Sequence, residues 1–361
     1  MSPRPAFRTI KAAMAHLQTR SLSSASGPRH LLSISDLSPA EFTRLVLNAS
    51  SHKAAVKAAL AAGEQPPKPL HGSLTGRTVA MMFSKRSTRT RVSTEAAVQL
   101  MGGHPMFLGK DDIQLGVNES LYDTSVVISS MTSCMVARVG AHKEVADLAA
   151  HSSVPVINAL SNDFHPLQTI ADFQTIHESF SPRTSSPSET SLGLEGLKVA
   201  WVGDSNNVLF DLATACVKMG VDIAVASPEG YGIPEAMRKV ILSGAEGART
   251  PGKLTETTVP EEAIKDADIL VTDTWVSMGQ EVEAQKRLKA FAGYQITNEL
   301  AKRGGAKPDW KFMHCLPRHP EEVDDDVFYG PRSLVFPEAE NRLWAAVAAL
   351  EAFVVNNGKI L

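Results

Sequence analysis

The stretch TVAMMFSKRSTRTRVSTE (residues 78–95) joins an apolar run to a polar segment rich in positive charge. Residues 78–83 predict a strand and residues 88–101 predict a helix. At this junction the free N–H groups of a helix N-terminus face whatever binds there, which favours an anion. The cationic residues are Lys85, Arg86, Arg89 and Arg91, and the hydroxyl donors include Ser87, Thr88 and Thr90. The stretch therefore predicts a phosphate site, with a solvated basic loop as the alternative.

Apolar and helical segments alternate along the rest of the chain. In the first half, strands are expected at 78–83, 134–139 and 154–159, and helices at 88–101, 120–132, 142–151 and 165–179. In the second half, strands are expected at 197–204, 221–228, 267–275 and 310–317, and helices at 206–219, from about 234, and at 338–355. This alternation predicts an α/β fold with mainly parallel sheets flanked by helices, in which ligands bind at the carboxyl ends of the strands.

The length of 361 residues suits two domains of ~150 residues each. Ser38 is expected to cap a helix that begins with proline. The Ser/Pro-rich stretch 181–193 lacks periodicity, and we expect a surface insertion there, near the domain junction. We expect a first domain of residues 31–178 completed by 340–361, whose helix packs back on it, and a second domain of residues 179–339.

The N-terminal segment has a distinct composition. It contains no Asp or Glu before Asp36, and its cations are Arg4, Arg8, Lys11, Arg20 and Arg29. Four apolar residues have helical spacing, namely Phe7, Ile10, Met14 and Leu17. The continuous apolar core of a secretory signal is missing. We therefore expect residues 1–30 to be a mitochondrial transit peptide, cut within residues 20–32, with a disordered basic tail as the alternative.

Composition excludes several function classes. Hydrophobic residues make up 43% of the chain, charged residues 21%, and the net charge is −3. No apolar run is long enough to span a bilayer, and the charge balance gives no general attraction for nucleic acid, so we expect neither partner. The three cysteines, Cys134, Cys216 and Cys315, have no C-x-x-C spacing, which argues against a disulfide framework or a thiolate zinc site.

Seven motifs in order resemble one family. SKRSTRTR (84–91) resembles the carbamoyl phosphate signature of the aspartate and ornithine carbamoyltransferases. The other motifs are MVARVG (135–140), FHPLQTIAD (164–172), WVGDSNNV (201–208), DTWVSMG (273–279), HCLPRH (314–319) and ENRLWA (340–345). The resemblance runs from about residue 30 to the C-terminus. It implies that the first domain binds carbamoyl phosphate and the second binds the amino acid, with no metal and no organic cofactor.

The resemblance also implies roles for individual residues. Those expected to bind carbamoyl phosphate are Ser87, Thr88, Arg89, Thr90, Gln114, Arg138, His165, Gln168, Cys315, Leu316 and Arg342. Attack by an amine on the carbonyl carbon passes through a tetrahedral oxyanion and expels phosphate, so the chemistry needs donors on the oxygen and cations on the phosphate. The residues expected to be catalytic are Arg138, His165, Cys315 and Asp273. Each of these residues, taken alone, also has a purely structural interpretation: a histidine can cap a helix, and a cysteine can belong to the core.

The acceptor amine is indicated by the second-domain motifs. Aspartate-type relatives carry a proline where Cys315 stands, whereas His-Cys-Leu-Pro is the ornithine-type sequence. The expected ornithine-binding residues are Asn207, Asp273, Ser277 and Met278, of which Asp273 offers a carboxylate to a cationic amino acid. Only a neutral δ-amine can attack, and we expect desolvation on domain closure, beside Asp273 and Cys315, to favour loss of its proton. The implied reaction gives L-citrulline and phosphate, a step of arginine biosynthesis or the urea cycle.

Other hypotheses stay open. A related acceptor, such as N-acetylornithine or aspartate, is the alternative among carbamoyltransferases. LKVAWVGDSNN (197–207) could begin a dinucleotide-binding module, although it lacks the three-glycine turn. A noncatalytic carbamoyl phosphate-binding relative is a third class, which intact Arg138, His165 and Cys315 disfavour.

The resemblance further implies an assembly. DDIQLGVNESLYDT (111–124) is similar to the family segment that reaches a neighbouring subunit's site, and Gln114 is the candidate for that contact. A homotrimer with shared active sites in the mitochondrial matrix is therefore expected. A loop that serves its own subunit is the alternative.

Overall fold

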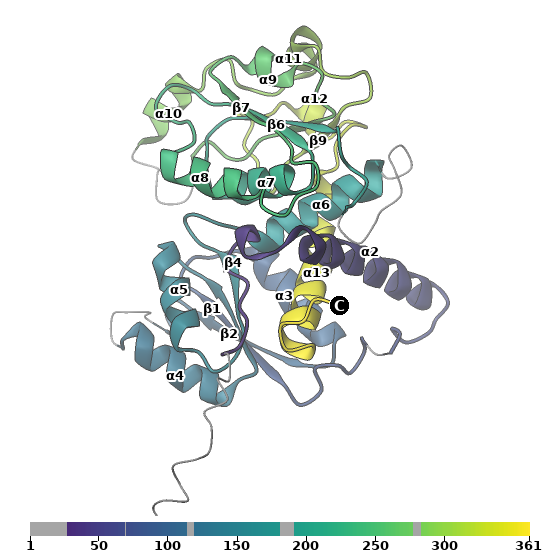
Figure 1. Cartoon of the computed structure of the whole chain (residues 1–361), viewed down its shortest axis with the longest axis vertical. Helices are drawn as coiled ribbons and strands as arrows, with labels where there is room; N and C mark the ends of the chain where they lie inside the picture. The colour runs from purple at the N-terminus through teal and green to yellow at the C-terminus, as the bar shows by residue number, and fades with distance from the viewer. Residues whose placement is uncertain (1–26, 69, 114–118, 181–190, 277–282) are drawn as a thin grey trace, which may run out of the picture.

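The computed structural model describes residues 27–68, 70–113, 119–180, 191–276 and 283–361. Two lobes lie one above the other, each built around a parallel sheet (Figure 1). The first sheet has the order β2-β1-β3-β4, and its strands are β1 (Thr78–Phe83), β2 (His104–Gly109), β3 (Cys134–Arg138) and β4 (Val156–Leu160). The second sheet has the order β7-β6-β5-β8-β9, and its strands are β5 (Lys198–Val202), β6 (Asp222–Ala226), β7 (Leu254–Thr257), β8 (Ile269–Val271) and β9 (Lys311–Met313). The α/β fold with two parallel sheets is therefore confirmed.

Helices flank both sheets. Those of the first lobe are the 3-10 turn η1 (Ile34–Asp36), α2 (Pro39–Ala61), α3 (Thr88–Leu100), α4 (Leu121–Met131), α5 (His142–His151) and α6 (Pro166–Phe180). Those of the second lobe are α7 (Asn207–Lys218), α8 (Glu235–Ser243), α9 (Pro260–Ile264), α10 (Ala284–Ala290), α11 (Asn298–Gly304) and α12 (Asp325–Phe328). The predicted cap is confirmed, because the Ser38 side chain accepts from the Glu41 N–H and the Glu41 carboxylate accepts from the Ser38 N–H.

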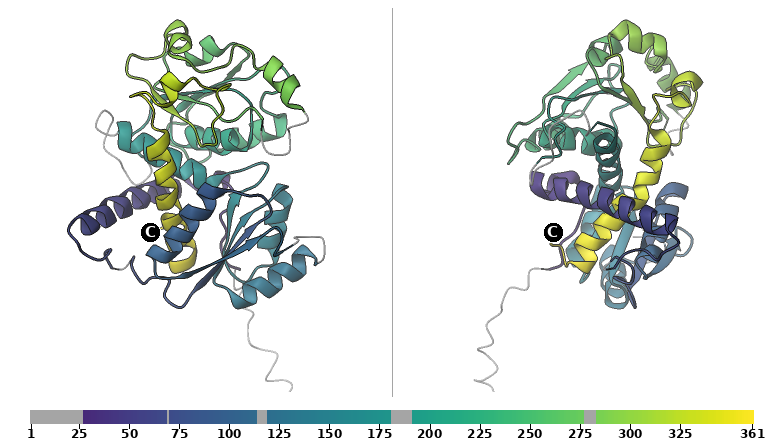
Figure 2. Two further views of the ribbon diagram at one scale, coloured as in Figure 1. Left: turned by 180° about the vertical axis from the view of Figure 1, so that it is seen from behind. Right: turned by 90° about the vertical axis from the view of Figure 1, so that its right-hand side faces the viewer.

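The last helix returns to the first lobe. Helix α13 (Val335–Leu350), which continues as η4 (Glu351–Val355), leaves the second lobe and packs against α2, α3 and α6 (Figures 1 and 2). Its buried face includes Trp344, Val347 and Leu350. Full burial of one such aliphatic side chain contributes about 1.5–3 kcal/mol, so the helix is a structural part of the first lobe. The prediction that it packs back on that lobe is confirmed.

One hydrophobic cluster continues from lobe to lobe. It contains Val79 of β1, Trp201 of β5 and Val347 of α13, all with no exposed surface. A continuous core limits how freely the lobes move relative to each other, which holds the carboxyl ends of the two sheets near one another.

Both sheets also have an edge strand that the apolar pattern does not predict. Strand β2 begins His104–Pro105 and is fully buried at none of its residues, and the four residues of β7 are half-buried or exposed. Proline is tolerated at a sheet edge because one side of an edge strand needs no ladder hydrogen bonds. Most of the predicted insertion, residues 181–190, lies outside the described residues, as do residues 1–26 of the predicted transit peptide.

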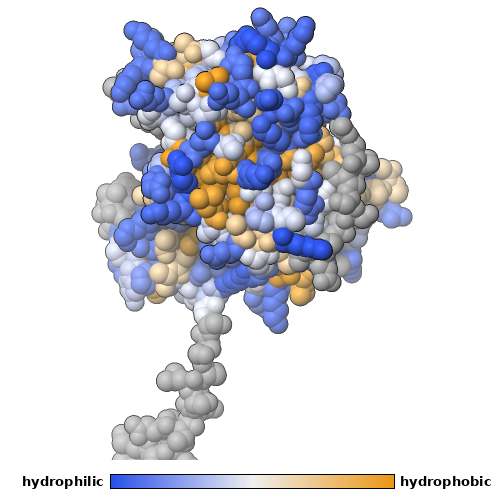
Figure 3. All heavy atoms as spheres, turned by 45° about the horizontal axis from the view of Figure 1, so that its top comes forward, coloured by the Kyte–Doolittle hydropathy of each residue, from blue (hydrophilic) through white to orange (hydrophobic). Residues whose placement is uncertain are grey.

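The surface is mostly polar. On the face shown in Figure 3, hydrophilic residues cover the top and the sides, and apolar residues gather near the middle. Within the described ranges, no helix is long and apolar enough to cross a membrane.

Candidate active site

The first wall of the site is the junction of β1 and α3. Ser87 caps α3, and its hydroxyl accepts from the Thr90 N–H at 3.3 Å and donates to Thr90 Oγ1 at 3.0 Å. The loop between strand and helix is held against β3, because the Ser84 N–H donates to the Arg138 carbonyl at 2.9 Å. The N-terminus of α3 therefore opens at the carboxyl end of the first sheet, where its N–H groups can face an anion.

Arg342 of α13 organises the adjoining wall. Its Nη1 lies 3.2 Å from Nε2 of His165 and 2.7 Å from Oε1 of Gln168, and its Nη2 lies 3.5 Å from Oγ1 of Thr90. A guanidinium only donates, so we infer that Nε2 of His165 accepts and that the ring proton sits on Nδ1. That Nδ1 is buried and has no hydrogen-bond partner among the described residues. His165 thus has a spare donor.

Burial controls the charge of this wall. Burial, together with the Arg342 guanidinium, lowers the pKa of His165 well below its usual range, so the imidazole is neutral. Burial also lowers the pKa of Arg138 to about 10, with repulsion from Arg89 as the second cause. The pKa of Arg342 is likewise lowered to about 10, mainly by burial. Three like charges this close repel one another, and a bound dianion would relieve that repulsion.

Arg89 bridges the two lobes. Its Nη2 donates to the carbonyl oxygen of Leu316, which follows β9 in the second lobe. Leu316 has a left-handed backbone conformation (φ 61°), which is uncommon for a residue with a side chain and is found mainly where surrounding structure imposes it. The first-lobe cation therefore contacts the second-lobe segment that carries Cys315.

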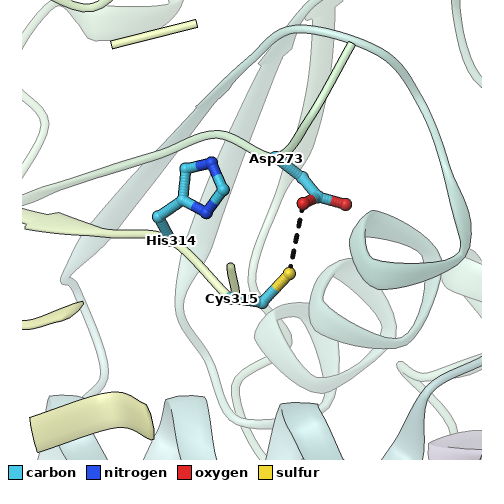
Figure 4. A group of neighbouring side chains, drawn as sticks. All are labelled: Asp273, His314 and Cys315. Carbon is cyan, nitrogen blue, oxygen red and sulfur yellow. Dashed lines mark hydrogen bonds between the residues drawn. The ribbon is translucent and has the colours of Figure 1, made fainter. Parts of the chain in front are cut away.

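The opposite wall is a group around Asp273, which follows β8. Its Oδ1 accepts from Sγ of Cys315 at 3.2 Å (Figure 4), and its Oδ2 accepts from Nδ2 of Asn206 at 2.8 Å. Burial, assisted by the Asp273 carboxylate, raises the pKa of Cys315 well above its usual range. Cys315 is therefore a protonated thiol that donates to Asp273, not a thiolate.

The same group contains three residues of types that can bind a metal. Asp273, His314 and Cys315 bring three possible ligand atoms within 4.8 Å of one another (Figure 4). However, Nδ1 of His314 accepts from the Leu316 N–H at 2.9 Å, and its Nε2 lies 3.4 Å from Oε1 of Glu322. Both ring nitrogens of His314 are therefore engaged, and neither is free to bind a metal. The geometry does not suit a bound metal.

The predicted residues that lie within the described ranges line a single cleft with a volume of about 1610 Å³. They are Ser87, Thr88, Arg89, Thr90, Arg138, His165, Gln168, Asn207, Asp273, Cys315, Leu316 and Arg342. Gln114, Ser277 and Met278 lie outside the described residues. Lys85 and Arg86 line the cleft too, so its first-lobe side is strongly positive while the carboxylate of Asp273 stands on the other side.

Two family models match the chain. They are the aspartate/ornithine carbamoyltransferase carbamoyl-P binding domain, over residues 29–178, and the Asp/Orn binding domain of the same enzymes, over residues 195–353. This chain belongs to the aspartate/ornithine carbamoyltransferase family.

Relatives of known name cover nearly the whole chain. The mitochondrial ornithine carbamoyltransferase of Emericella nidulans is 72% identical over 343 residues, which are 95% of this chain and 94% of that protein. The ornithine carbamoyltransferase of Saccharomyces cerevisiae is 49% identical over 93% of this chain and 97% of its own length. The crystal structure of a mitochondrial ornithine carbamoyltransferase from Coccidioides immitis is 67% identical with a TM-score of 0.85, and the match covers 92% of this chain and 100% of that one.

The structure also shows what the motifs of this carbamoyltransferase did not reveal. Asn206, not Asn207, contacts Asp273, whereas Nδ2 of Asn207 donates to the Ser161 carbonyl at 2.6 Å. The side chain of Arg318 in HCLPRH donates to the Val323 carbonyl, packs over Phe328, and is not among the residues lining the cleft.

Two carboxyl groups behind the cleft were missed as well. Asp172 and Glu338 are buried next to Gln168. A signal for them exists in the sequence, because each lies four residues from a predicted site residue on the same helix and so shares a face with it: Asp172 follows Gln168, and Glu338 precedes Arg342.

Proposed function

We propose that this chain transfers the carbamoyl group of carbamoyl phosphate to the δ-amine of L-ornithine, giving L-citrulline and phosphate. One observation carries the proposal: the guanidinium groups of Arg89, Arg138 and Arg342 converge on one side of a cleft whose other side presents the Asp273 carboxylate. An anionic donor and a cationic amino acid are complementary to these two sides. The naming of close relatives as ornithine carbamoyltransferases supports ornithine over other acceptors.

The phosphate is held by the first wall. The N–H groups at the start of α3 and the hydroxyls of Ser87, Thr88 and Thr90 can donate to its oxygens, and Arg89 adds a planar guanidinium. As the carbon–oxygen bond to phosphate breaks, negative charge grows on the leaving group. Arg89 and the helix N-terminus stabilise that charge.

The adjoining wall, organised by Arg342, supplies hydrogen-bond donors to the carbonyl oxygen. The Nδ1–H of His165, which has no partner among the described residues, and the guanidinium of Arg138 are the donors for the oxyanion. Preorganised donors of this kind contribute roughly 3–4 kcal/mol each in other acyl-transfer enzymes. Gln168, Arg342 and the Leu316 carbonyl orient the carbamoyl end.

The amine of ornithine loses its proton beside the opposite wall, around Asp273. Ornithine arrives with a protonated δ-amine whose pKa is near ~10, and only the neutral nitrogen can bond to carbon. Burial of that ammonium in the closed cleft favours the neutral form. Asp273, held by Asn206 and Cys315, lies where the amino acid binds. The nitrogen–carbon bond forms, the carbon–oxygen bond to phosphate breaks, and the nitrogen gives up one proton.

A citrulline assay on the purified chain tests this function. Wild type is expected to form citrulline from carbamoyl phosphate and ornithine, and to form much less product with aspartate or N-acetylornithine. Arg89→Ala should nearly abolish turnover with the fold retained, whereas Arg44→Ala, an exposed arginine of α2, serves as the matched control and should match wild type. An Arg89→Ala enzyme of unchanged rate would contradict the phosphate role.

The proposal extends to location and assembly. We propose a protein of the mitochondrial matrix that forms a homotrimer with shared active sites. The mitochondrial names of the relatives support the location. Four large apolar side chains of α4 are 42–68% exposed, which is a surface that another protomer can cover: Tyr122, Val126, Val127 and Met131.

Three measurements test the location and the assembly. Light scattering is expected to give three times the chain mass. Gln114→Ala is expected to lose turnover, and turnover should return when this variant is mixed with Arg89→Ala subunits.

Arg29 pairs with Glu41 at 2.5 Å and donates to the Gly358 carbonyl at 3.2 Å, so we place transit-peptide cleavage before Arg29. N-terminal sequencing of the imported protein checks this.

A further inference from the structure

Two buried carboxyl groups meet behind the cleft, where α6 packs on α13. Asp172 is 3% exposed and Glu338 is 2% exposed, and neither lines the cleft. Nε2 of Gln168 donates to Oδ1 of Asp172 at 2.8 Å and to Oε1 of Glu338 at 3.0 Å. The two carboxyl groups therefore meet at the same amide group. Both groups are thus joined through one site residue.

A proton on one of the two groups removes the repulsion between two carboxylates. Two ionised carboxylates only accept hydrogen bonds, so a bond between them can form only when one carries a proton. The surroundings favour that state: burial raises the pKa of Asp172 to about 7, and burial with the Asp172 charge raises the pKa of Glu338 well above its usual range. Arg342 faces the pair and favours negative charge on it.

The pair fixes the amide of Gln168. With the NH₂ group of Gln168 turned toward the two carboxyl groups, its oxygen accepts from Nη1 of Arg342 at 2.7 Å. A flipped amide would set its NH₂ against the guanidinium and its oxygen against the carboxyl oxygens, which leaves donors facing donors. Only one orientation of Gln168 fits.

Glu338 extends the same network to the second lobe. Its Oε2 accepts from the backbone N–H of His314 at 2.9 Å. His314 begins the segment whose next residues are Cys315 and Leu316, and the Leu316 carbonyl accepts from Arg89. One carboxyl group thus fixes a site residue of the first lobe and the backbone that carries two site residues of the second.

We propose that Glu338, paired with Asp172, is a positioning residue of carbamoyl transfer. It fixes the Gln168 amide and the 314–316 backbone relative to each other. The inference rests on the function proposed above, because Gln168 and Leu316 matter only if they orient the carbamoyl group. Glu338 acts through these groups and does not line the cleft.

Three variants and one control test the proposal in the full-length enzyme. Glu338→Ala and Asp172→Ala are expected to lower kcat roughly 10- to 100-fold and to raise KM for carbamoyl phosphate, because small displacements of positioning groups cost that much. Asp172→Asn offers an oxygen to Gln168 and an N–H to Glu338, so it should keep most of the activity. Thr169→Val, a buried α6 neighbour whose hydroxyl has no partner in the described chain, should match wild type.

A pH profile adds a readout that a purely structural role would not move. In wild type, loss of the shared proton at alkaline pH sets two carboxylates against each other, so kcat should fall there. Asp172→Asn leaves only one carboxyl group, so repulsion between two carboxylates cannot arise and that part of the fall should be missing. The other groups that face the pair, namely Arg342, Asp273, Cys315 and Cys216, are all present in this variant, so the two enzymes differ by one ionisable group.

The outcomes separate the two proposals. An active wild type with Glu338→Ala and Asp172→Ala at wild-type kcat and KM would overturn the positioning role alone. If the alanine variants do not fold, as thermal unfolding would reveal, the profile of Asp172→Asn decides: a curve parallel to wild type overturns the inference and a flatter alkaline limb supports it. A wild type that forms no citrulline would overturn the proposed function and, with it, this inference.

Discussion

Sγ of Cys315 lies 3.2 Å from Oδ1 of Asp273, and the thiol donates to the carboxylate across the carboxyl ends of β8 and β9. These strands are neighbours in the sheet, so residues after them come together although 42 positions separate them in the sequence. Because the thiol is protonated, its contribution is a hydrogen bond and not a thiolate nucleophile.

Replacing Cys315 tests that hydrogen bond. Cys315→Ser keeps a donor for Asp273, while Cys315→Ala leaves the carboxylate with one donor fewer, worth about 1.5–3 kcal/mol for a bond to a charged group. We expect kcat/KM for ornithine to fall about 10-fold or more in the alanine variant and less in the serine variant. Steady-state kinetics across pH provides the measurement. A Cys315→Ala profile that keeps both the shape and the height of the wild-type curve would remove Cys315 from the mechanism.

Neutralising Asp273 should affect one substrate selectively. Asp273→Asn keeps the size of the side chain but removes the charge that faces a cationic amino acid. We expect KM for ornithine to rise about 10- to 100-fold, as the loss of a charged hydrogen bond implies, with KM for carbamoyl phosphate nearly unchanged. Asp326→Asn, an exposed position in α12, is the control and should leave both constants alone. Equal increases in both KM values would speak against an amino acid site at Asp273.

Asp211 joins three parts of the chain and should be important for stability. Its carboxyl group accepts from Ser33 Oγ and the Ile34 N–H, both at 2.9 Å, and from the His165 N–H at 2.7 Å. An asparagine amide cannot accept all three, so Asp211→Asn leaves a buried donor unsatisfied. We expect the free energy of unfolding to drop by about 1–3 kcal/mol. Urea denaturation measures it, with the buried Thr214→Val on the same helix for comparison. Identical denaturation curves for Asp211→Asn and wild type would refute the role.

The Arg29–Glu41 pair should make stability depend on acid. The hydrogen bond from Arg29 is the main cause that lowers the pKa of Glu41 to about 2. A depressed carboxyl pKa stabilises the fold above the unfolded value of about 4.3, and that stability is lost as the pH falls toward 2. Thermal melting of Glu41→Gln should therefore lie below wild type at pH 6, and the two curves should converge near pH 2. The exposed Glu64→Gln is the control. A difference that persists unchanged at pH 2 would contradict this cause.

Elements with a strong local signal were predictable. The apolar run before SKRSTRTR gives β1 at Thr78–Phe83 as expected, and the Ser87 cap follows from its hydroxyl at a helix start. Strands β2 and β7 were missed because edge strands bury little and therefore show no apolar pattern. The pairing of Asn206 with Asp273 was missed for another reason: neighbouring asparagines are equivalent until the start of α7 fixes which one turns toward β8.

The sequence by itself determined the α/β class, the anion-binding junction at residues 84–91 and the motifs that lead to one family, because these depend on periodicity and local chemistry. Only the tertiary structure decided that Gln168, Asp172, Glu338 and His314 form one network, and that Nε2 of His165 faces Arg342. Such contacts join residues up to 177 positions apart, and their distances depend on how α6, α13 and two sheets pack, which no local pattern encodes.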